Sequence, residues 1–468
     1  MVNSLPEKSA ASTVRFVLDG RIIKIDDPSP QETLLQCLRD RLDRKDVKEG
    51  CAEGDCGACT VVIGELDGDS LAYRPINSCI RLLPTVDGRE IVTASSLVAA
   101  DGNLHPVQQA LVDQHASQCG FCTPGFVMSL FALWLDRDEI ERPQIVDAIA
   151  GNLCRCTGYR PIIDAGLAMK RYGEPAHWGR ADAFSDARRE RLAAMARSEP
   201  GDSLLIDAGA GFHAPRSLDE LAQALLTRPD ALVLAGGTDI GLWVTKQLRE
   251  LPHVVYLGEV RDLRRIEHRP EAIVIGAAVP LTQAFEAVCT EWPELGELAL
   301  RFASPPVCNS GTLCGNIANG SPIGDSMPAL LALGAELELR FGDRVRTLDL
   351  ADFYLGYRQT ALQAGEFLMN VVIPRRGADE TLACWKVSKR FDQDISAVCA
   401  AVWMEQRDGE VARIRMGFGG MAAVPSRAPR AEAALSGKAL SMASIEAAGR
   451  ALGDDFTPLT DMRASSQY

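Results

Sequence analysis

The stretch "KEGCAEGDCGACT", residues 48–60, places three cysteines and three glycines within thirteen positions. The cysteines form C-x4-C-x2-C, and a fourth follows after nineteen intervening residues, giving the set Cys51, Cys56, Cys59 and Cys79. This is the plant-type spacing of [2Fe–2S] ligands. Glycine permits the positive φ and close backbone approach that an anionic cluster requires. A structural zinc site is the alternative, but zinc usually takes two separated pairs of ligands. The spacing therefore favours iron and sulfur.

A second group of cysteines lies in "QCGFCTPG" and "GNLCRCTGYRP", and consists of Cys119, Cys122, Cys154 and Cys156. Cys122 stands just before a predicted helix whose first turn holds Pro124, and a helix N-terminus stabilises a thiolate. The second pair lies between two further predicted helices. In isolation C-x2-C with C-x-C is compatible with zinc as well as iron. The plant-type loop upstream favours a second [2Fe–2S] cluster.

Composition narrows the class of protein. The chain has 468 residues, a net charge of −14 and fourteen cysteines. The acidic balance argues against nucleic-acid binding, which needs a basic face. No stretch approaches the roughly 18 to 20 apolar residues of a membrane helix, and the N-terminus has no apolar export signal. We therefore expect a cytoplasmic protein, in which clustered thiols indicate metal sites more often than disulfides. The six scattered cysteines are interpreted as small buried hydrophobic residues or bystanders.

The pattern along the chain predicts several α+β domains. "VRFVLDGRIIKID" predicts a hairpin around Asp19-Gly20, and "ETLLQCLRDRL" predicts a helix capped by Thr33. Strands return around the Asp-Gly turn of "TVVIGELDGDSLAYRPI". Four short helices bounded by Pro or Gly are predicted between about residues 105 and 172. Residues 176–203 are polar and poorly periodic, which indicates a linker, and mixed helices and strands follow.

Two later stretches indicate a ligand. In "VLAGGTDIG", residues 233–241, a predicted strand is followed by two glycines. The backbone N–H groups of such a turn are suited to bind a diphosphate. "SGTLCGNIANGSPIGDSMP", residues 310–328, is too polar and glycine-rich for a core segment and is predicted to be a ligand-binding loop.

The cysteine motifs, without a gap, resemble those of the molybdenum hydroxylases, the xanthine dehydrogenase and aldehyde oxidase family. The resemblance implies a plant-type ferredoxin-like β-grasp domain at 1–95, a helical [2Fe–2S] domain at 96–175 and a linker at 176–203. It further implies an FAD-binding α+β domain of the vanillyl-alcohol oxidase-like type at 204–376 and a C-terminal α+β flavoprotein domain at 377–468. In the family the second cluster lies closest to molybdopterin, and Gln118 matches a pterin contact.

The same resemblance implies the FAD contacts. The diphosphate loop corresponds to Leu232, Val233, Leu234, Ala235, Gly236, Gly237, Thr238 and Asp239. Other matching positions are Phe302, Ser310, Gly311, Thr312, Gly315, Asn316, Asp325, Leu368 and Lys386. Gly237 departs from relatives that carry Asn, so its contact is expected to come from the backbone. "KRFDQDIS", residues 389–396, matches a loop beside the flavin.

No molybdopterin-binding portion is found in the 468 residues, so the resemblance implies that it lies on a partner large subunit. No catalytic residue is expected on this chain. The expected role is electron transfer in a split xanthine dehydrogenase, from hypoxanthine or xanthine on the partner through both clusters to FAD and NAD+. A dimer of heterodimers is the oligomer known in the family. An aldehyde or N-heterocycle dehydrogenase is one alternative, and a zinc-stapled scaffold is an alternative of another class.

Overall fold

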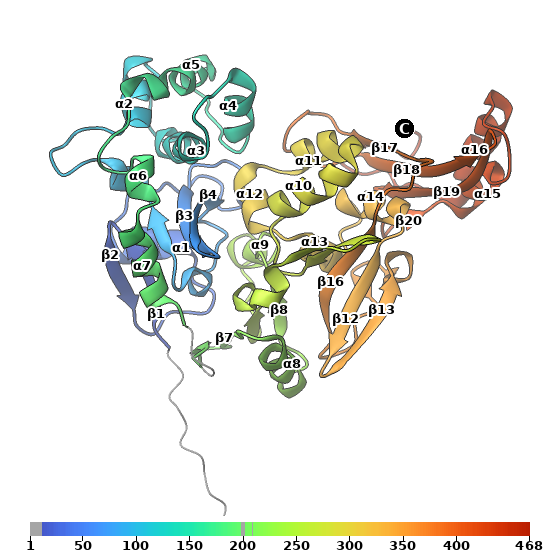
Figure 1. Ribbon diagram of the computed structural model, residues 1–468, viewed down its shortest axis with the longest axis horizontal. Coiled ribbons are helices and arrows are strands. Elements are labelled where there is room, and N and C mark those ends of the chain that lie inside the picture. The colour runs from blue at the N-terminus through green and yellow to red at the C-terminus, as the bar shows by residue number, and fades with distance from the viewer. Residues whose placement is uncertain (1–11, 198–201, 208) are drawn as a thin grey trace, which may run out of the picture. The chain divides into compact units, whose positions relative to one another are not determined.

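The computed structural model describes residues 12–197, 202–207 and 209–468 (Figure 1). Residues 198–201 of the predicted linker lie outside this part. The chain divides into two compact units. The first contains the described residues up to Arg216 with Ala231–Glu259 and Pro305–Ser310, and the second contains Ser217–Asp230, Val260–Ser304 and Gly311–Tyr468. The predicted flavin region is therefore shared between the units.

The first unit begins with a five-stranded sheet of order β2-β1-β5-β3-β4. Its strands are β1 (Val14–Leu18), β2 (Arg21–Ile25), β3 (Thr60–Asp67), β4 (Ser70–Asn77) and β5 (Glu90–Val92). The predicted hairpin is confirmed, because β1 pairs antiparallel with β2 around Asp19 and Gly20, both at positive φ. Strand β1 also runs parallel to β5. The sheet places the cysteine loop between η1 and β3.

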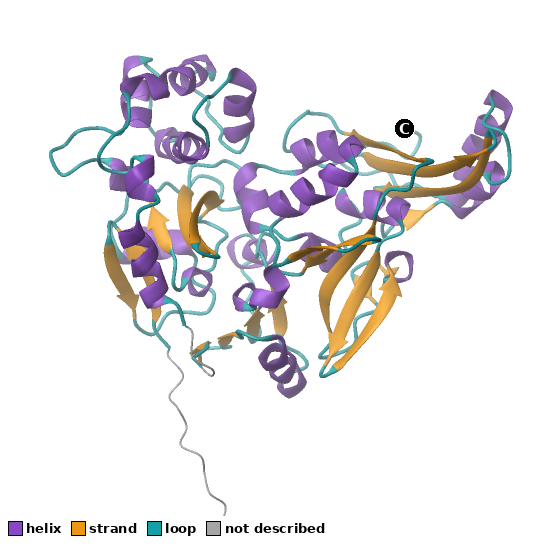
Figure 2. Ribbon diagram, viewed as in Figure 1, coloured by secondary structure: helices purple, strands orange, loops and turns teal. Residues whose placement is uncertain are grey.

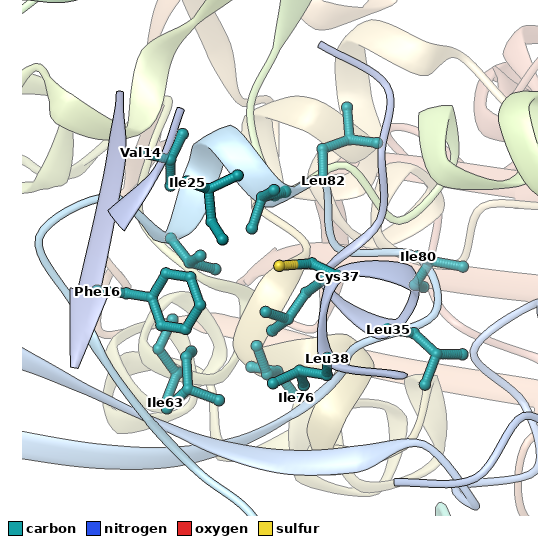
Figure 3. Packing of buried hydrophobic residues seen from close by; sticks show 14 of the residues in the cluster. Val14, Phe16, Ile25, Leu35, Cys37, Leu38, Ile63, Ile76, Ile80 and Leu82 are labelled. Atoms are coloured by element: carbon teal, nitrogen blue, oxygen red, sulfur yellow. The ribbon is translucent and has the colours of Figure 1, made fainter. Parts of the chain in front are cut away.

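The predicted capped helix begins as expected and then changes type. Helix α1 (Leu34–Gln36) starts at Thr33, whose side chain accepts from Gln36 N, and continues as a π-helical turn, η1 (Cys37–Arg41). Leu34, Leu35 and Leu38 are buried in the core beneath the sheet. Figure 3 shows Cys37 in this core with Leu35 and Leu38.

Four helices form the second cysteine module: α2 (Pro106–Asp113), α3 (Thr123–Asp136), α4 (Arg142–Ala148) and α5 (Arg160–Ala168). Figure 1 shows them gathered together. Each has proline in its first turn, where the missing N–H costs nothing. Helix α3 is apolar almost all round and buried along nearly its whole length. The predicted helical module is thus present.

The segment predicted to be a linker contains α6 (Arg180–Ala183) and α7 (Asp186–Met195). Helix α7 packs on the first sheet, with Leu192 and Met195 in a small core with Val17 and Leu71. Arg188 lies 2.6 Å from the carboxylate of Glu90 and stacks on Trp178, 3.7 Å from the ring centroid. A buried ion pair therefore fastens this segment, which its polar composition did not indicate.

The first unit ends with a four-stranded sheet of order β6-β7-β9-β8. The strands are β6 (Leu204–Ile206), β7 (Phe212–Ala214), β8 (Leu232–Leu234) and β9 (Val254–Tyr256). Their buried side chains belong to the same core as those of β1, β3 and α1. Helices α9 (Ile240–Thr245) and α12 (Pro305–Ser310) complete this unit.

The second unit contains an antiparallel sheet of order β10-β11-β16-β12-β13 (Figure 2). Its strands are β10 (Ile266–His268), β11 (Ala272–Gly276), β12 (Glu336–Phe341), β13 (Arg344–Asp349) and β16 (Phe367–Pro374). A small hairpin joins β14 (Tyr354–Gly356) to β15 (Gln359–Thr360). The helices are α8 (Leu218–Thr227), α10 (Leu281–Glu291), α11 (Gly296–Phe302), α13 (Leu313–Asn319) and α14 (Ser326–Leu333).

A second antiparallel sheet, β17-β18-β19-β20, carries the C-terminal helices. Its elements are β17 (Glu380–Val387), β18 (Val398–Arg407), β19 (Glu410–Gly419), β20 (Ser426–Arg427), α15 (Pro429–Leu435) and α16 (Met442–Asp455). Helix α14 approaches β19 so closely that a Cβ at Gly417 would clash with the carbonyl of Pro328. Short 3-10 turns are η2 (Leu83–Val86), η3 (Ala94–Leu97), η4 (Met169–Tyr172), η5 (Leu257–Glu259), η6 (Arg261–Arg264), η7 (Pro293–Leu295) and η8 (Leu350–Asp352). Among the described residues, no helix has the length and apolarity needed to cross a bilayer.

Arg188→Leu tests whether the buried ion pair fastens α7. It leaves the Glu90 carboxylate, which is 2% exposed, without its cation, and breaking a buried pair costs about 3–5 kcal/mol. We expect a loss of that order in the free energy of unfolding, measured by urea denaturation. Arg189→Leu is the control, because Arg189 pairs with Asp186 at the surface. Equal losses in the two variants would contradict the interpretation.

Candidate cofactor sites

The plant-type cysteines meet at one end of the first sheet. Cys51 and Cys56 are half-buried on the loop before β3, whereas Cys59 and Cys79 are 2% exposed. The thiol of Cys51 contacts that of Cys56, and the thiol of Cys79 contacts both Cys51 and Cys59. The structure thus brings together the four ligands that the spacing predicts.

Backbone N–H groups surround the outer pair. Cys51 Sγ accepts from the backbone N–H of Glu53 and of Asp55, each at 3.4 Å, and of Cys56 at 3.3 Å. Cys56 Sγ accepts from Cys51 N at 3.3 Å. The thiol hydrogen bond from Cys56 is the largest cause that lowers the pKa of Cys51. Such a nest of donors fits an anionic cluster.

Glycine makes the nest possible for two reasons. Gly54 and Gly57 are at positive φ, of 81° and 68°. Gly50 has an ordinary backbone, but a Cβ there would lie 2.7 Å from Cys56 Sγ. The loop therefore needs glycine both for conformation and for proximity.

The second group of thiols lies on the loops that flank α3, α4 and α5. Cys119 Sγ lies 3.6 Å from Cys156 Sγ, and the thiols of Cys122 and Cys154 are in contact. Cys119 and Cys156 are exposed. Gln118 is exposed and donates to the carbonyl of Cys156 at 3.1 Å, so it lies at the open side of this group.

The thiol contacts fit four thiolates around one cofactor in each module. In the first group the Cys51 thiol contacts Cys56, and the Cys79 thiol contacts both Cys51 and Cys59. In the second group Cys119 contacts Cys156, and Cys122 contacts Cys154. A [2Fe–2S] cluster takes four thiolates, two on each iron.

The two cysteine modules contact each other through backbone groups and the side chain of Asn152. Leu153 N donates to Cys56 O at 2.9 Å, and Asn152 Nδ2 donates to Gly57 O at 3.1 Å. A Cβ at Gly57 would clash with the carbonyl of Gly151, and one at Gly125 would clash with Gly57 O. The loop that carries Cys56 is thus bonded to the segment that carries Cys154.

The remaining cysteines mostly behave as buried apolar residues, as interpreted from the sequence. Cys37, Cys308, Cys314 and Cys399 are buried. Burial raises the pKa of Cys37 and of Cys314 to about 12, which keeps both thiols protonated and unreactive.

The predicted diphosphate loop belongs to the first unit. Strand β8 leads into Gly236 and Gly237, the latter at a φ of 78°, and α9 follows. A Cβ at Gly241 would lie 2.5 Å from the carbonyl of Ile80, the residue after Cys79. Helix α9, which follows the predicted diphosphate loop, therefore packs directly on the segment that carries Cys79. The hydroxyl of Ser310, which is also in this unit, donates a hydrogen bond to Pro306 O.

The other predicted FAD contacts lie in the second unit, and one expectation is corrected there. Residues 310–328 are not one loop, because α13 occupies their middle. Thr312 accepts from Gly315 N at the start of this helix, and Gly320 ends it in the left-handed conformation. The same small polar residues that suggested a loop act as helix caps.

Several predicted contacts in this unit are linked. Asn316 Oδ1 accepts from Ser326 Oγ at 2.6 Å, and Lys386 Nζ lies 2.5 Å from Asp325. Leu368 is buried on β16. Gly311 O accepts from Leu281 N. Phe302 lies apart at the end of α11 and packs on Phe285 with ring centroids 5.1 Å apart.

Lys386 is occupied within the protein. Besides Asp325 it donates to Asp394 O at 2.8 Å and Ser396 Oγ at 3.1 Å, and Ser396 Oγ donates to Asp325 at 2.6 Å. All three of its N–H donors are therefore used. Lys386 fixes the end of the 389–396 loop to the start of α14.

Sequence reasoning missed the residues that hold these sites together, above all Asn77, Asn152 and Ile80. A signal for the asparagines was present, because "NSC" (77–79) and "NLC" (152–154) both place Asn two residues before a ligand. No neighbouring residue in the sequence indicates a role for Ile80, because that role depends on its contact with Gly241, which is distant in the sequence.

Family models match the segments that carry these groups of residues. Residues 16–82 match the 2Fe-2S iron-sulfur cluster binding domain and residues 93–167 the [2Fe-2S] binding domain. Residues 208–376 match the FAD binding domain in molybdopterin dehydrogenase, and residues 383–468 the CO dehydrogenase flavoprotein C-terminal domain. The predicted α+β multidomain fold and the cofactor set of two [2Fe–2S] clusters and FAD are confirmed. The chain is an iron–sulfur flavoprotein of the oxidoreductase class.

Individual relatives define the family. Xanthine dehydrogenase of Drosophila subobscura is 32% identical over 477 residues, covering 91% of this chain and 35% of that protein. A solved chain of carbon monoxide dehydrogenase from Hydrogenophaga pseudoflava is 30% identical with a TM-score of 0.52, covering 55% of this chain and 90% of its own. Quinoline 2-oxidoreductase from Pseudomonas putida 86 is 26% identical, with a TM-score of 0.50 and coverage of 55% and 90%. The chain belongs to the molybdenum hydroxylase family and corresponds to its iron–sulfur and flavin region. It spans about a third of the length of the curated relatives it matches.

Gly57→Ala tests the contact between the cysteine modules. The new methyl group meets the carbonyl of Gly151, so we expect a lower melting temperature and less than the wild-type iron per chain. Gly68→Ala is the control, because Gly68 is also at positive φ, on the β3–β4 turn, but has open space around it. If both variants lose stability and iron equally, backbone strain rather than the contact is responsible.

Lys386→Met tests the link to the 389–396 loop. It leaves the Asp325 carboxylate buried without its cation, which costs about 3–5 kcal/mol. We expect that loss in the free energy of unfolding and a lower FAD content after purification. The control Lys389→Met removes an exposed lysine whose ammonium donates to Met462 O. A melting temperature and FAD content equal to those of the wild type would contradict the role of Lys386 in fixing the 389–396 loop.

Proposed function

We propose that this chain is the electron-transfer subunit of a xanthine dehydrogenase, acting with a partner subunit that binds molybdopterin and oxidises hypoxanthine or xanthine. Cys119, Cys122, Cys154 and Cys156 would hold the cluster that faces the partner, and Cys51, Cys56, Cys59 and Cys79 the cluster that faces FAD. When bound, the two clusters pass single electrons and FAD combines them for hydride transfer to NAD+.

The observation that carries the proposal is the continuity of the first unit. Leu153 N–H bonds Cys56 O, and Gly241 packs on Ile80 beside Cys79. Both thiol sites and the predicted diphosphate loop are therefore fastened to one another by short backbone contacts. This is what a relay needs, because electron transfer slows steeply with distance.

The open side of the second thiol site supports a partner. Cys119 and Cys156 are exposed, and the apolar side chains of Phe121 and Leu153 beside them are 47% and 52% exposed. Exposed apolar groups beside a redox site fit a protein interface. Gln118 lies at the same side, where a contact to the partner's pterin is expected. We expect the assembly to be a dimer of heterodimers.

The choice of a purine follows from the curated relatives. The xanthine dehydrogenases match along 87% to 96% of this chain, across both the cluster and flavin regions. The solved carbon monoxide dehydrogenase and quinoline oxidoreductase chains each cover 55% of it. An N-heterocycle or aldehyde dehydrogenase is the second candidate, favoured by the likeness to the quinoline enzyme.

Iron analysis and EPR test the cofactor relay. Two [2Fe–2S] clusters require about four irons per chain and two distinct S = 1/2 signals after reduction by dithionite. Zinc in place of iron and a silent spectrum would remove the electron-transfer role.

Anaerobic bleaching of the flavin tests the substrates. In the complex co-purified with the molybdopterin subunit, xanthine and NADH should each bleach the flavin absorbance near neutral pH. Quinoline or an aldehyde serves as the comparison substrate. Bleaching by either of these but not by xanthine would favour the second candidate, and no response to NADH would exclude NAD+ as the acceptor.

A further inference from the structure

Asn77 is a buried side chain directed at the first thiol site. It ends β4, opposite Thr60 of β3, and is 2% exposed. Its Nδ2 donates to Cys59 Sγ at 3.9 Å. Its Oδ1 has no hydrogen-bond partner within the described part of the chain, and lies 3.8 Å from the Cβ position of Gly54 on the cysteine loop. The amide thus stands between the loop and a ligand.

The position of Asn77 is fixed by its neighbours rather than by its own side chain. Ser78 N and Ser78 Oγ both bond Cys59 O, at 3.4 and 2.7 Å, and Leu35 N bonds Ser78 O. The backbone would therefore hold its course without the amide. Burying an amide whose oxygen has no partner among the described residues costs stability, so the segment does not need this side chain for its backbone course.

Asn77 reaches one of the two thiols of this site that are shielded from water, Cys59, and Cys79 is the other. Cys51 and Cys56 receive their N–H groups on the half-exposed side of the loop. Cys59 is 2% exposed and takes the backbone N–H of Cys79 and the amide of Asn77. Removing that amide leaves a buried sulfur with one donor fewer and no solvent to replace it.

We propose that Asn77 raises the reduction potential of the first cluster by its hydrogen bond to Cys59. Reduction adds one negative charge to the cluster, and an N–H donor stabilises the more negative form. Asn77 is a positioning residue that acts through a ligand and does not hold iron itself. The proposal rests on the proposed electron-transfer function, in which this potential decides how readily electrons pass from the second cluster toward the flavin.

The other asparagine of the Asn-x-Cys pattern has a different use. Asn152 Nδ2 donates to Gly57 O, and Asn152 Oδ1 accepts from Ser129 Oγ at 2.7 Å. Both ends of that side chain are satisfied by protein groups, so it fastens the modules. Only Asn77 directs its donor at a ligand sulfur while its oxygen stays without a partner.

The test is an EPR-monitored redox titration of the full-length holoprotein. Asn77→Leu keeps the branched shape and removes the donor, and we expect about a tenfold shift of the reduction equilibrium, a potential lower by about 59 mV for one electron. Asn77→Asp keeps the shape and places a carboxylate at the donor position, so its potential should fall at least as far. The second cluster's signal in the same sample should not move in either variant.

Ser78→Ala is the matched control. It removes an equally buried hydrogen bond from the same segment, but to the carbonyl of Cys59 rather than its sulfur. Unchanged potentials in both Asn77 variants, or the same shift in Ser78→Ala, would overturn the proposal. Loss of the first signal in both Asn77 variants would also overturn it, because Asn77 would then be needed only for assembly. A wild-type protein without cluster signals would instead count against the proposed function.

Discussion

The absence of side-chain atoms at Gly57 and Gly125 is the constraint on which the cofactor sites depend. Backbone meets backbone at this point, and Asn152 bonds the carbonyl of Gly57 across the contact. Any Cβ there would separate the loop of Cys56 from the segment of Cys154. The glycine contacts and the bond from Leu153 N to Cys56 O join backbone atoms only, so they do not vary with side-chain rotamers. The spacing of the two thiol sites is therefore a property of the fold.

A glycine also allows a close backbone contact where the predicted flavin region begins. Gly241 of α9 packs on the carbonyl of Ile80, next to Cys79, and the strands β6–β9 share a core with the plant-type sheet. This explains why residues 231–259 group with the N-terminal part of the chain, although the family match for the flavin region begins at residue 208. The two boundaries differ because residues 231–259 match the flavin-domain model but pack in the core of the N-terminal unit.

Local rules were enough to predict which cysteines the structure brings together, the β1–β2 hairpin and the four helices with proline in the first turn. In each case the signal and the structure lie within a few residues. They were not enough for Arg188, which looks like one charge in a polar linker until Glu90, 98 residues away, meets it. They also failed for residues 310–328, since Thr312 and Gly320 are equally at home in a ligand loop and at helix ends. Residue type states what chemistry is possible, and long-range contacts decide which is used.

The two thiol sites differ in exposure in a way that fits their proposed order. Cys59 and Cys79 are almost fully buried, whereas Cys119 and Cys156 are exposed. A site that exchanges electrons with another polypeptide must reach the surface, and a site that serves only its own chain gains from exclusion of water. In a buried site each hydrogen bond to sulfur has more effect, because no solvent competes with it. In the proposed function, the more buried first site is therefore where an amide would set the potential, and the more exposed second site is where the partner would exchange electrons.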